Sequence, residues 1–546
     1  MTKKALALLL VFAMIFSFAS CSDDGSGASL KYPINEEPVC IDPQIAVGQA
    51  AKMVVVNSFE GLVRLNKEGK IVAGVAESWS YDPNTLTYTF KLRDDTHWKL
   101  LKEFTTLFGY EKFDDLEKHT DTRVKAKDFV FGFQRAVDPD TKAPDASSLY
   151  IIKNAKKINE GKMSPDNLGV KAVGDWEIKI TLENNSMSEK HFLSLLTQSI
   201  CMPCNEGFFN ATNGRYGLDY TTTLCNGPFY FKYWTKESSL TLKKNDGYKG
   251  YSEVMPEGVT FFVSEDIEDR MNKFVDGVYC AAPLGTQTLK ESSKYTVKKN
   301  YDTVWSLSFN CADEYLKNAE LRRALCSSIN STNVVSQGSD LKKTPSIIPP
   351  ACIVAGADMS SVPVTVQSYD PAKAQVRWNN ALEKLDKSKI SLELLCLEEH
   401  ESAMRRLIQE WQHTFGLGIN VSITVLPQKE MEDRVRHGDY QIALTPVTAY
   451  STSASEFLSS LKTNGDNNIF NYTDTKFDRM VDELHLYHGE ELLKKVREAE
   501  RKFLLNGVAL PIFSSPSFYA IAQGVEGIFV DPESAAVSFL EVTVKD

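Results

Sequence analysis

Apolar side chains recur at every second position in two short runs of the first half of the chain. The runs 86–92 and 176–182 both alternate apolar and polar residues, a pattern typical of strands with one buried face. Between them, residues 127–137 carry apolar side chains at helical spacing, and Asp138-Pro139 follows at the point where a helix would end. The pattern therefore predicts a first half dominated by mixed sheet structure.

The second half has a different order, in which strand-like and helix-like runs alternate. Five runs follow the order strand, helix, strand, helix, strand, at 391–397, 402–415, 419–425, 429–436 and 441–444. Because a crossover helix returns the chain to pair in parallel, this order predicts parallel strands with helices on both faces. Further runs predict helices at 317–329 and within 474–503, and strands at 509–513, 519–522 and 537–544.

Size and charge narrow the class of protein. With 546 residues the chain exceeds the size at which one hydrophobic core stops growing, so two or three domains are expected. Its 61 basic and 72 acidic residues give a formal charge of −11, which argues against nucleic acid as a partner. The acidity suits a protein that stays soluble outside a cell.

The N-terminus has the parts of an export signal. Lys3 and Lys4 precede an apolar run at 6–18, which is shorter than the roughly 20 residues of a membrane-spanning helix. Small residues then lead to Cys21, and the polar stretch after it suits a flexible tether. The segment resembles the bacterial lipobox, in which the cysteine is lipidated and becomes the first mature residue. A plain secretory signal is the alternative, and both readings predict export.

Signals for catalysis or metal binding fail on spacing. His400 begins a sequence like a zinc-protease helix, but Met404 stands where the second histidine is needed. Cys201 and Cys204 form a CxxC pair without the second pair or nearby histidines of a zinc site. With Cys21 set aside, nine cysteines remain, an odd number that argues against a disulfide framework. We therefore expect no enzymatic activity, no cofactor and no metal.

Nine short motifs occur in the order found in one family of binding proteins. They are Ile41-Asp42-Pro43, 57–63, 74–79, 88–93 with Trp98, 127–129 with Arg135, 226–229 with Asn245, 321–325 with Ile329, 369–374, and 438–440. Through them the chain resembles the extracytoplasmic solute-binding proteins of ABC importers, in the oligopeptide, dipeptide and nickel class (family 5). The resemblance implies an α/β, two-lobed periplasmic-binding-protein-like fold with mixed sheets, hinge strands and an extra domain inserted in the first lobe.

The resemblance also implies a division of the chain. Residues 1–20 are expected to be the signal peptide, and residues 21–29 the lipidated cysteine and its tether. Lobe I is expected to combine 30–70, 176–275 and 505–546, with 71–175 as its extra subdomain, and lobe II to span 276–504.

Candidate ligand-binding residues follow from the same resemblance. Asn226 and Gly227 belong to a stretch that lines the cleft in the family, although an ordinary turn is an equally good reading. Trp305 and Asn310 lie in a strand at the place where the second lobe meets the cleft, and a core role for Trp305 is the alternative. Tyr450 stands where peptide-binding relatives have an acid that pairs with the ligand's α-ammonium.

Not every charged motif needs a functional reading. Arg322 and Arg323 precede an apolar run, and we interpret them as a solvated helix face. We expect Trp79, Tyr88 and Phe90 to form an aromatic core contact.

The sequence therefore predicts a lipid-anchored extracytoplasmic receptor, expected to be a monomer, that binds oligopeptide-like ligands and delivers them to ABC permease subunits. The alternative is a surface signalling or adhesion lipoprotein with the same fold. The expected location is the outer face of the cell membrane, reached through the lipid at Cys21.

Overall fold

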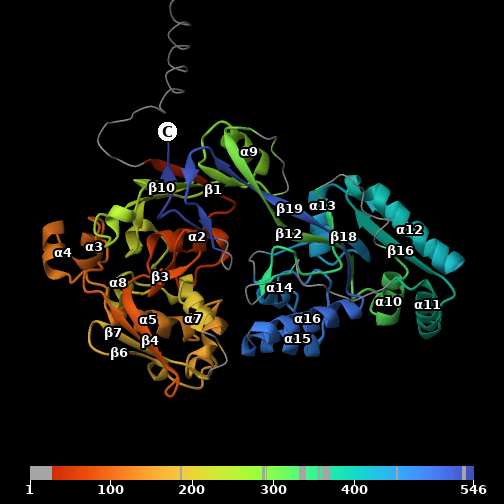
Figure 1. Cartoon of the computed structure of the whole chain (residues 1–546), viewed down its shortest axis with the longest axis horizontal. Coiled ribbons are helices and arrows are strands. Elements are labelled where there is room, and N and C mark those ends of the chain that lie inside the picture. Colours follow the sequence, from red (N-terminus) through yellow and green to blue (C-terminus); the bar gives the residue numbers. More distant parts are fainter. Residues whose placement is uncertain are drawn as a thin grey trace, which may run out of the picture.

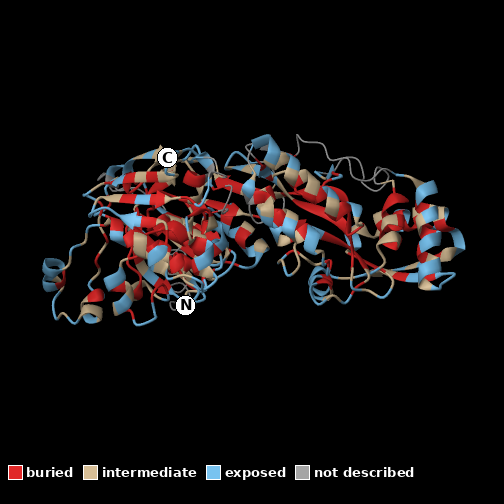
Figure 2. Ribbon diagram, turned by 90° about the horizontal axis from the view of Figure 1, so that it is seen from below, coloured by how far each residue is buried: buried red, intermediate tan, exposed pale blue. Residues whose placement is uncertain are grey.

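The computed structural model describes residues 28–184, 187, 189–285, 289, 292–330, 340–354, 357–359, 369–449, 453–487, 489–531 and 536–545. The elements gather in two bodies, and the long strands β12 (Tyr295–Phe309) and β19 (Ala509–Ala522) run from one to the other (Figure 1). Buried residues are concentrated inside each body and continue along the strands between them (Figure 2). The chain thus has the mixed α/β architecture that the sequence predicts.

Two four-stranded sheets form the first body. One has the order β1 (Ser29–Ile34), β10 (Gly258–Val263), β9 (Ser239–Lys244), β8 (Phe229–Thr235), with β1 parallel to β10. The other has the order β4 (Ala76–Asp82), β5 (Thr87–Leu92), β7 (Glu177–Thr181), β6 (Val170–Ala172) and is antiparallel. The predicted strands at 86–92 and 176–182 are confirmed as β5 and β7.

Alternation places the aromatic residues of the second sheet on its inner face. Tyr88 and Phe90 are buried, and their ring centroids lie 6.2 Å apart. Trp79, on the neighbouring strand, packs against Phe90 at 6.4 Å, which confirms the expected core contact. Aromatic rings bury large areas, so this cluster accounts for much of the local stability.

Helices cover the first body. The predicted helix at 127–137 is confirmed as α5 (Ala126–Val137), which ends before Pro139. Others are α2 (Gly48–Ser58), α6 (Ala155–Asn159), α7 (Glu189–Leu195), α8 (Glu206–Ala211) and α9 (Ile267–Val275). Two short helices, α3 (Phe104–Phe108) and α4 (Phe113–His119), lie at one end of the molecule (Figure 1). The Phe104 ring holds them against Phe208, with centroids 4.8 Å apart.

The second body is built on a seven-stranded mixed sheet with the order β11-β19-β12-β18-β16-β17, in which β13 also pairs with β19. The strands β16 (Ile390–Cys396), β17 (Ile419–Val425) and β18 (Ile442–Thr448) are parallel, while β12 runs antiparallel to β18 and β19. The predicted parallel β-α-β-α-β unit is therefore confirmed.

Seven helices flank this sheet in the described residues. They are α10 (Ala319–Ser327), α11 (Pro371–Leu385), α12 (Glu401–Phe415), α13 (Gln428–Arg436), α14 (Ala454–Ser460), α15 (Thr475–Asp482) and α16 (Gly489–Leu505). Short strands complete the fold: β2 (Val63–Leu65), β3 (Ile71–Ala73), β11 (Ala281–Pro283), β13 (Lys342–Lys343), β14 (Ile353–Val354) and β15 (Ala357–Asp358), and near the end β20 (Val525–Glu526), β21 (Phe529–Val530), β22 (Val537–Ser538) and β23 (Thr543–Val544).

The two faces of the long strands bury different cores. Trp305 belongs to a cluster with residues of α10, α11 and α12, whereas Val304 belongs to one with residues of α14, α15 and α16. At the other end of the same strands, Phe518 and Val297 pack with residues of α9 and β11. The backbone of Cys280, next to β11, donates to Lys31 of β1, which ties this third cluster to the first body.

Three sequence expectations need correction. The strands expected at 509–513 and 519–522 are one strand, β19, because Pro516 lies opposite a bulge and the pairing with β12 resumes beyond it. The strand expected at 537–544 is two short strands, β22 and β23. Arg322 is buried rather than solvated, and its guanidinium donates to carbonyl oxygens of Leu316, Asn506 and Gly507.

Arg322 is buried because it contacts the C-terminal end of α16, which the local sequence around Arg322 does not reveal. The last carbonyls of a helix have no partner within the helix. Arg322 donates to Asn506 at 3.0 Å and to Gly507 at 3.2 Å, and Arg323 donates to Leu505 at 2.8 Å. Both arginines therefore complete the end of a helix that is some 180 residues away in sequence.

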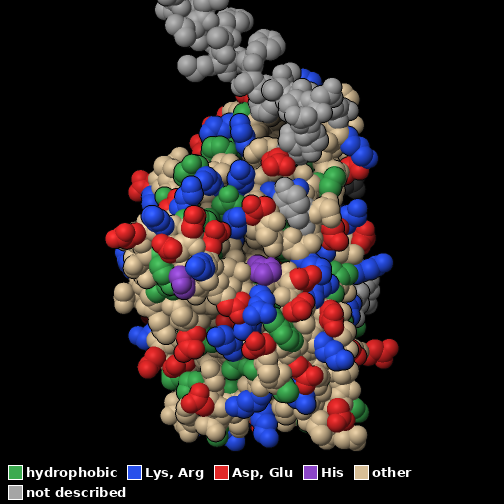
Figure 3. All heavy atoms as spheres, turned by 90° about the vertical axis from the view of Figure 1, so that its left-hand side faces the viewer, with side chains coloured by type: hydrophobic (Ala, Val, Ile, Leu, Met, Phe, Trp, Pro, Cys, Tyr) green, Lys and Arg blue, Asp and Glu red, His purple; other side chains and the backbone are tan. Residues whose placement is uncertain are grey.

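The end of the chain packs against the first body. The amide of Asn57 donates to the Val537 carbonyl at 2.7 Å and accepts from the Phe539 nitrogen at 2.8 Å. Figure 3 shows acidic and basic side chains interspersed over the end of the molecule that carries α3 and α4. Within the described parts of the chain, no helix is long and apolar enough to cross a membrane.

Candidate ligand-binding site

The parallel strands of the second body end at one edge of their sheet. In open α/β sheets, ligands bind in the crevice outside the carboxyl ends of the strands. Here β16 ends at Cys396 and leads through Glu398–His400 into α12, while β18 ends at Thr448. The residues that follow Cys396 and Thr448, with the part of β12 beside them, therefore form the candidate site on this body.

Trp305 lies beside this edge. It pairs with Pro446 of β18 and with Phe513 of β19, and its indole nitrogen donates to the Ser515 hydroxyl at 3.1 Å. Its ring stacks on Phe513 with centroids 5.9 Å apart and meets the His400 ring edge-on at 4.6 Å. Only 8% of Trp305 is exposed. The structure therefore gives Trp305 substantial core packing, and its contact with a ligand stays a prediction.

His400 connects this aromatic cluster to an acidic loop. Burial lowers the pKa of its imidazole, and the Glu399 carboxylate partly offsets that effect. The nitrogen Nε2 lies 3.3 Å from Glu399 Oε1, but the geometry is not that of a hydrogen bond. We therefore regard His400 as neutral at pH 7, and its ring as part of the wall formed with Trp305 and Phe513.

Hydroxyl groups line the same edge between β12 and β18. The hydroxyls of Thr303 and Thr448 are 3.0 Å apart, and the Ala449 nitrogen donates to the Asp302 carbonyl. Asp302 is half-buried, and this burial raises the pKa of its carboxyl group. Its carboxylate accepts a short hydrogen bond from the Ser517 hydroxyl.

In the first body, Asn226 holds the end of α2 in place. Its side-chain oxygen accepts from the Glu60 nitrogen at 3.1 Å, and its side-chain nitrogen donates to the Glu60 carbonyl at 2.9 Å. The residue is 2% exposed. The amide thus accepts from and donates to backbone that is 166 positions away in sequence.

Gly227 allows the backbone to approach this segment closely. A Cβ at Gly227 would lie 2.6 Å from the nitrogen of Phe59, and the Gly227 nitrogen donates to the Ser58 carbonyl at 3.0 Å. Asn245 donates to the Gly227 carbonyl at 2.9 Å. Only glycine fits such an approach, so we assign Asn226 and Gly227 a role in joining segments, and a direct contact with ligand stays a prediction.

A small cavity of about 50 Å³ adjoins the place where Asn226 and Gly227 contact the residues that follow α2. Pro228 and Tyr248 line it together with the buried carboxylate of Glu60 and the side chain of Arg64. Burial raises the pKa of Glu60, an effect that the Tyr248 hydroxyl and Arg64 partly offset. The cavity is large enough for one or two waters and too small for a peptide.

Asn310 directly follows the last residue of β12, away from the candidate edge at Thr303 and Trp305. Its amide donates to the carbonyls of Gly438 and Tyr440, and its oxygen accepts from Asn471. The side chain therefore fixes the Gly-Asp-Tyr motif and borders an open polar cavity of about 520 Å³. Asn310 is five residue steps along the strand from Trp305, a distance of about 16 Å, so the two do not form one pocket.

The remaining predicted site residues, Cys21 and Tyr450, lie outside the described residues. Among the residues that the structure describes, no group of His, Cys, Asp and Glu side chains is placed to hold a metal ion. The described cysteines are all free, and Cys201 and Cys204 are both buried.

The sequence reading missed one charged pair. Arg135 of α5 forms a buried ion pair with Asp42, and also donates to Gln44 at 2.7 Å. Both residues belong to the motifs quoted above, but their spacing of 93 positions carries no signal that they touch. Burial of the ion pair requires this close geometry, because an isolated buried charge costs several kcal/mol.

Comparison with known proteins adds three findings. Residues 70–469 match the family of bacterial extracellular solute-binding proteins, family 5. The oligopeptide-binding protein OppA of Bacillus subtilis is 25% identical, over 97% of both chains. A dipeptide-binding protein of Lactococcus lactis is 26% identical, over 86% of this chain and 84% of its own.

Solved structures agree in fold. The substrate-binding domain of an oligopeptide ABC transporter from Bacillus anthracis has a TM-score of 0.68 at 25% identity, covering 95% of this chain and 99% of its own. Listeria monocytogenes OppA bound to peptide has a TM-score of 0.68 at 22% identity, with 96% and 100% covered.

Proposed function

The chain belongs to the bacterial extracellular solute-binding proteins of family 5, and on this basis we propose that it is the peptide receptor of an ABC importer. The observation that carries the proposal is similarity along the full length to a protein named for oligopeptide binding. The family consists of binding proteins, not enzymes. The chain therefore binds and delivers a solute and performs no chemical step on it.

We place the ligand in a cleft between two lobes, divided as the sequence predicts: 30–70, 176–275 and 505–546 against 276–504, with 71–175 as a subdomain. One boundary changes, because residues 508–513 pack in the cores of the second body and therefore belong to its lobe. A ligand that touches both lobes makes all its contacts only when they are closed, so it shifts the equilibrium towards that state. The crossing of β12 and β19 between the two bodies supports a motion of this kind.

Oligopeptide-like ligands would be held mainly through their backbone. Main-chain hydrogen bonds are common to all peptides, and roomy, wet side-chain pockets accept many residues. The carboxyl edge of β16 and β18 offers hydroxyl groups, an aromatic wall around Trp305, and the exposed acids Glu398 and Glu399. This chemistry suits a ligand with both polar backbone and apolar side chains.

The test offers the purified protein a mixed peptide library. Native mass spectrometry identifies any peptide that the protein takes from the library or has carried through purification. Thermal unfolding with that peptide should show stabilisation by mass action. Small-angle scattering should show a smaller radius of gyration with ligand. Stabilisation without compaction contradicts closure, and no bound peptide of any length contradicts the peptide receptor.

We further propose that the mature protein is anchored in the membrane by a lipid on Cys21 and meets permease subunits there. A diacylated cysteine supplies two lipid chains, which is enough for stable anchoring. Cys21→Ser should move the protein to the soluble fraction with its ligand affinity unchanged. Membrane association of the variant in high salt would contradict the anchor and leave the receptor function untouched.

A further inference from the structure

One sheet of the first body has an outer face that carries lysines and no acids. Its strands β1, β10, β9 and β8 contain four lysines, and neither Asp nor Glu occurs in them. The whole chain, in contrast, has a formal charge of −11. Alternate residues of these strands are buried in the core of the first body, so the residues between them point outwards. A local excess of positive charge on an acidic protein indicates a negatively charged partner.

The strand register gathers three of these lysines on the outward side. Two neighbouring cross-strand rows lie there, one of Lys31, Thr260, Thr241 and Tyr233, the other of Ser29, Gly258, Lys243 and Tyr230. Lys232 occupies a bulge of β8, and its ammonium nitrogen lies 5.3 Å from the centre of the Tyr233 ring, which places it on the same side. We call this side, with Lys31, Lys232 and Lys243, the lysine face.

The lysine face is open to solvent and keeps its charge. Lys243 is exposed, and Tyr233 is exposed by 58%. Among the described residues, neither Lys232 nor Lys243 has an ion-pair partner. Asp246, which follows β9 closely, pairs instead with Lys99. The positive charge is therefore available to a partner outside the chain.

The chain enters this face at the end nearest to the proposed lipid. The strand β1 begins at Ser29, which belongs to one of the two rows and follows Cys21 by eight positions. An extended chain spans at most about 3.6 Å per residue, so Ser29 lies within about 29 Å of a lipid on Cys21. The anchor therefore keeps the lysine face within reach of the lipid headgroups.

We propose that the lysine face binds the anionic phospholipid surface of the membrane in which the chain is anchored. Charges more than about 8 Å apart are largely screened at physiological salt, so the lysines at the contact outweigh the negative charge elsewhere on the chain. Tyrosine rings favour the headgroup region, and Tyr230 and Tyr233 lie beside the lysines. The inference rests on the proposed lipid anchor, which brings the face to the membrane.

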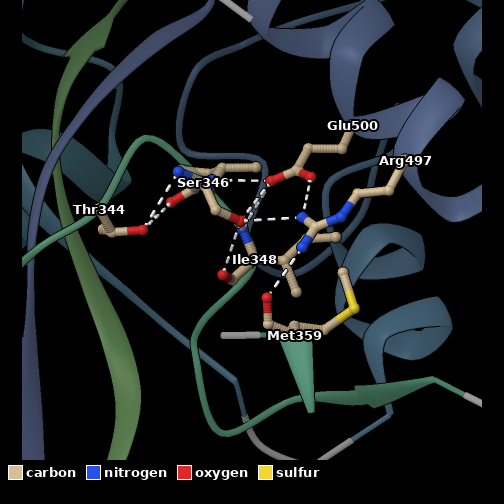
Figure 4. A network of polar contacts seen from close by, with 7 residues as sticks. Thr344, Ser346, Ile348, Met359, Arg497 and Glu500 are labelled. Carbon is tan, nitrogen blue, oxygen red and sulfur yellow. Dashed lines mark hydrogen bonds and ion pairs between the residues drawn. The ribbon is translucent and has the colours of Figure 1, made fainter. Parts of the chain in front are cut away.

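Docking through this sheet fixes the first body and leaves the second body free. The second body contributes no strand to the sheet. Its own parts are joined to one another by a buried network (Figure 4). Glu500 of α16 is fully buried and accepts from the Ser346 hydroxyl and the Ile347 nitrogen, while Arg497 donates to the Met359 carbonyl at 2.9 Å. The second body can therefore move as a unit while the first stays on the membrane.

The experiment measures vesicle binding by sedimentation, with the Cys21→Ser chain so that no lipid anchor contributes. The vesicles contain either phosphatidylcholine alone or equal parts of phosphatidylcholine and phosphatidylglycerol, at millimolar lipid. The protein should bind the phosphatidylglycerol vesicles in low salt, and high salt should release it. Changing Lys232→Gln and Lys243→Gln together should lower the partition coefficient about 30-fold, because each lysine at an anionic surface contributes about fivefold. Equal binding to both kinds of vesicle overturns the role of charge.

Two lysines of the second body provide the matched control. Lys384 in α11 and Lys429 in α13 are both exposed. Changing both to Gln removes the same total charge and should leave the partition coefficient within about twofold of its starting value. Equal losses in the two double variants would overturn the lysine face, since binding would then follow net charge alone.

Failure of the Cys21→Ser chain to bind phosphatidylglycerol vesicles in low salt also overturns the lysine face. These measurements stand apart from the proposed function, because the protein carries no anchor and no peptide is added. A wild-type protein found in the soluble fraction contradicts the anchor, whereas the vesicle measurements decide the surface contact.

Discussion

The side-chain amide of Asn226 pairs with the backbone of Glu60 in both directions, as one strand residue pairs with another. Asn226→Ala leaves a buried N–H and a buried carbonyl without partners. Each unsatisfied group costs about 1 to 3 kcal/mol, so we expect the free energy of unfolding to fall by about 2 to 6 kcal/mol. Denaturant unfolding measures this loss.

Asn167→Ala provides the control for that prediction. Its amide is exposed and makes one long hydrogen bond, 3.4 Å, to the Ser164 carbonyl. Removing it should change stability by less than about 0.5 kcal/mol. If Asn226→Ala were as stable as this control and yet bound peptide poorly, the role of Asn226 would be to contact the ligand and not to hold the Glu60 backbone in place.

Trp305→Phe separates packing from ligand contact at the candidate edge. Phenylalanine keeps a ring to stack on Phe513 but removes the indole nitrogen that donates to Ser515. We predict that peptide affinity falls by about tenfold, or 1.4 kcal/mol, because the larger indole face is lost from the cleft. Calorimetry with a peptide identified by mass spectrometry measures the change.

Ser515→Ala tests whether the lost hydrogen bond explains the effect. It removes the partner of the Trp305 indole and leaves the ring in place. Affinity should then stay at the wild-type value. Trp305→Phe with unchanged affinity and a lowered melting temperature would assign Trp305 to the core alone.

The hydrophobic pattern predicted most of the sheet structure because strand and helix periods are local properties. The parallel order of β16, β17 and β18 followed from alternation with helices, and the structure confirms it. The division of β19 into two strands was wrong, since Ser514, Ser515 and Pro516 interrupt the apolar pattern while the pairing with β12 resumes beyond the bulge.

Side-chain roles were harder to predict, because they depend on partners distant in sequence. A charge run before an apolar segment indicated solvent exposure for Arg322, yet its partners Asn506 and Gly507 directly follow the last residue of α16. The turn signature at Asn226 likewise gave no sign of Glu60. Neither spacing nor residue type contains such information, so only the tertiary structure could supply it.

Asp128 gives the protein a pH-dependent stability. Burial raises its pKa to about 6, although hydrogen bonds from the Lys125 nitrogen and the Trp98 indole partly offset the effect. Between about pH 4 and pH 6 the folded protein therefore holds a proton that the unfolded chain has lost. The contribution of Asp128 to stability is therefore greatest below the pKa that its carboxyl group has in the unfolded chain. This contribution is lost as the pH rises through the pKa of the folded protein.

Asp128→Asn should remove that dependence. Its side-chain oxygen can still accept from Lys125 and Trp98, but it carries no charge to bury. The stability of the variant relative to the wild type should rise between about pH 4 and pH 6, by at most about 3 kcal/mol, since each pKa unit corresponds to 1.4 kcal/mol. Denaturant unfolding across this pH range measures the slope, with Asp114→Asn at an exposed carboxylate as control. If the unfolding free energies of Asp128→Asn and Asp114→Asn changed with pH in the same way, Asp128 would not be the source of the pH dependence.

The last prediction concerns the amino terminus of a bound peptide. The resemblance places Tyr450 where peptide-binding relatives have an acid for the ligand's α-ammonium, and tyrosine carries no negative charge at neutral pH. Truncating one partner of a buried charge pair typically costs about 2 to 5 kcal/mol. Without the pair, we expect acetylation of the peptide N-terminus to change affinity by less than about 1.5 kcal/mol.

Calorimetry on free and acetylated forms of one peptide decides the question. A small difference means that the amine stays in water or that the ligand is recognised elsewhere along its backbone. A loss of several kcal/mol on acetylation would contradict the prediction and require a carboxylate near the amine. Glu456, exposed in the first turn of α14, is the nearest acid downstream of Tyr450. Glu456→Gln would then abolish the difference between the two peptides if that residue supplies the charge, and would preserve it if the acid lies elsewhere.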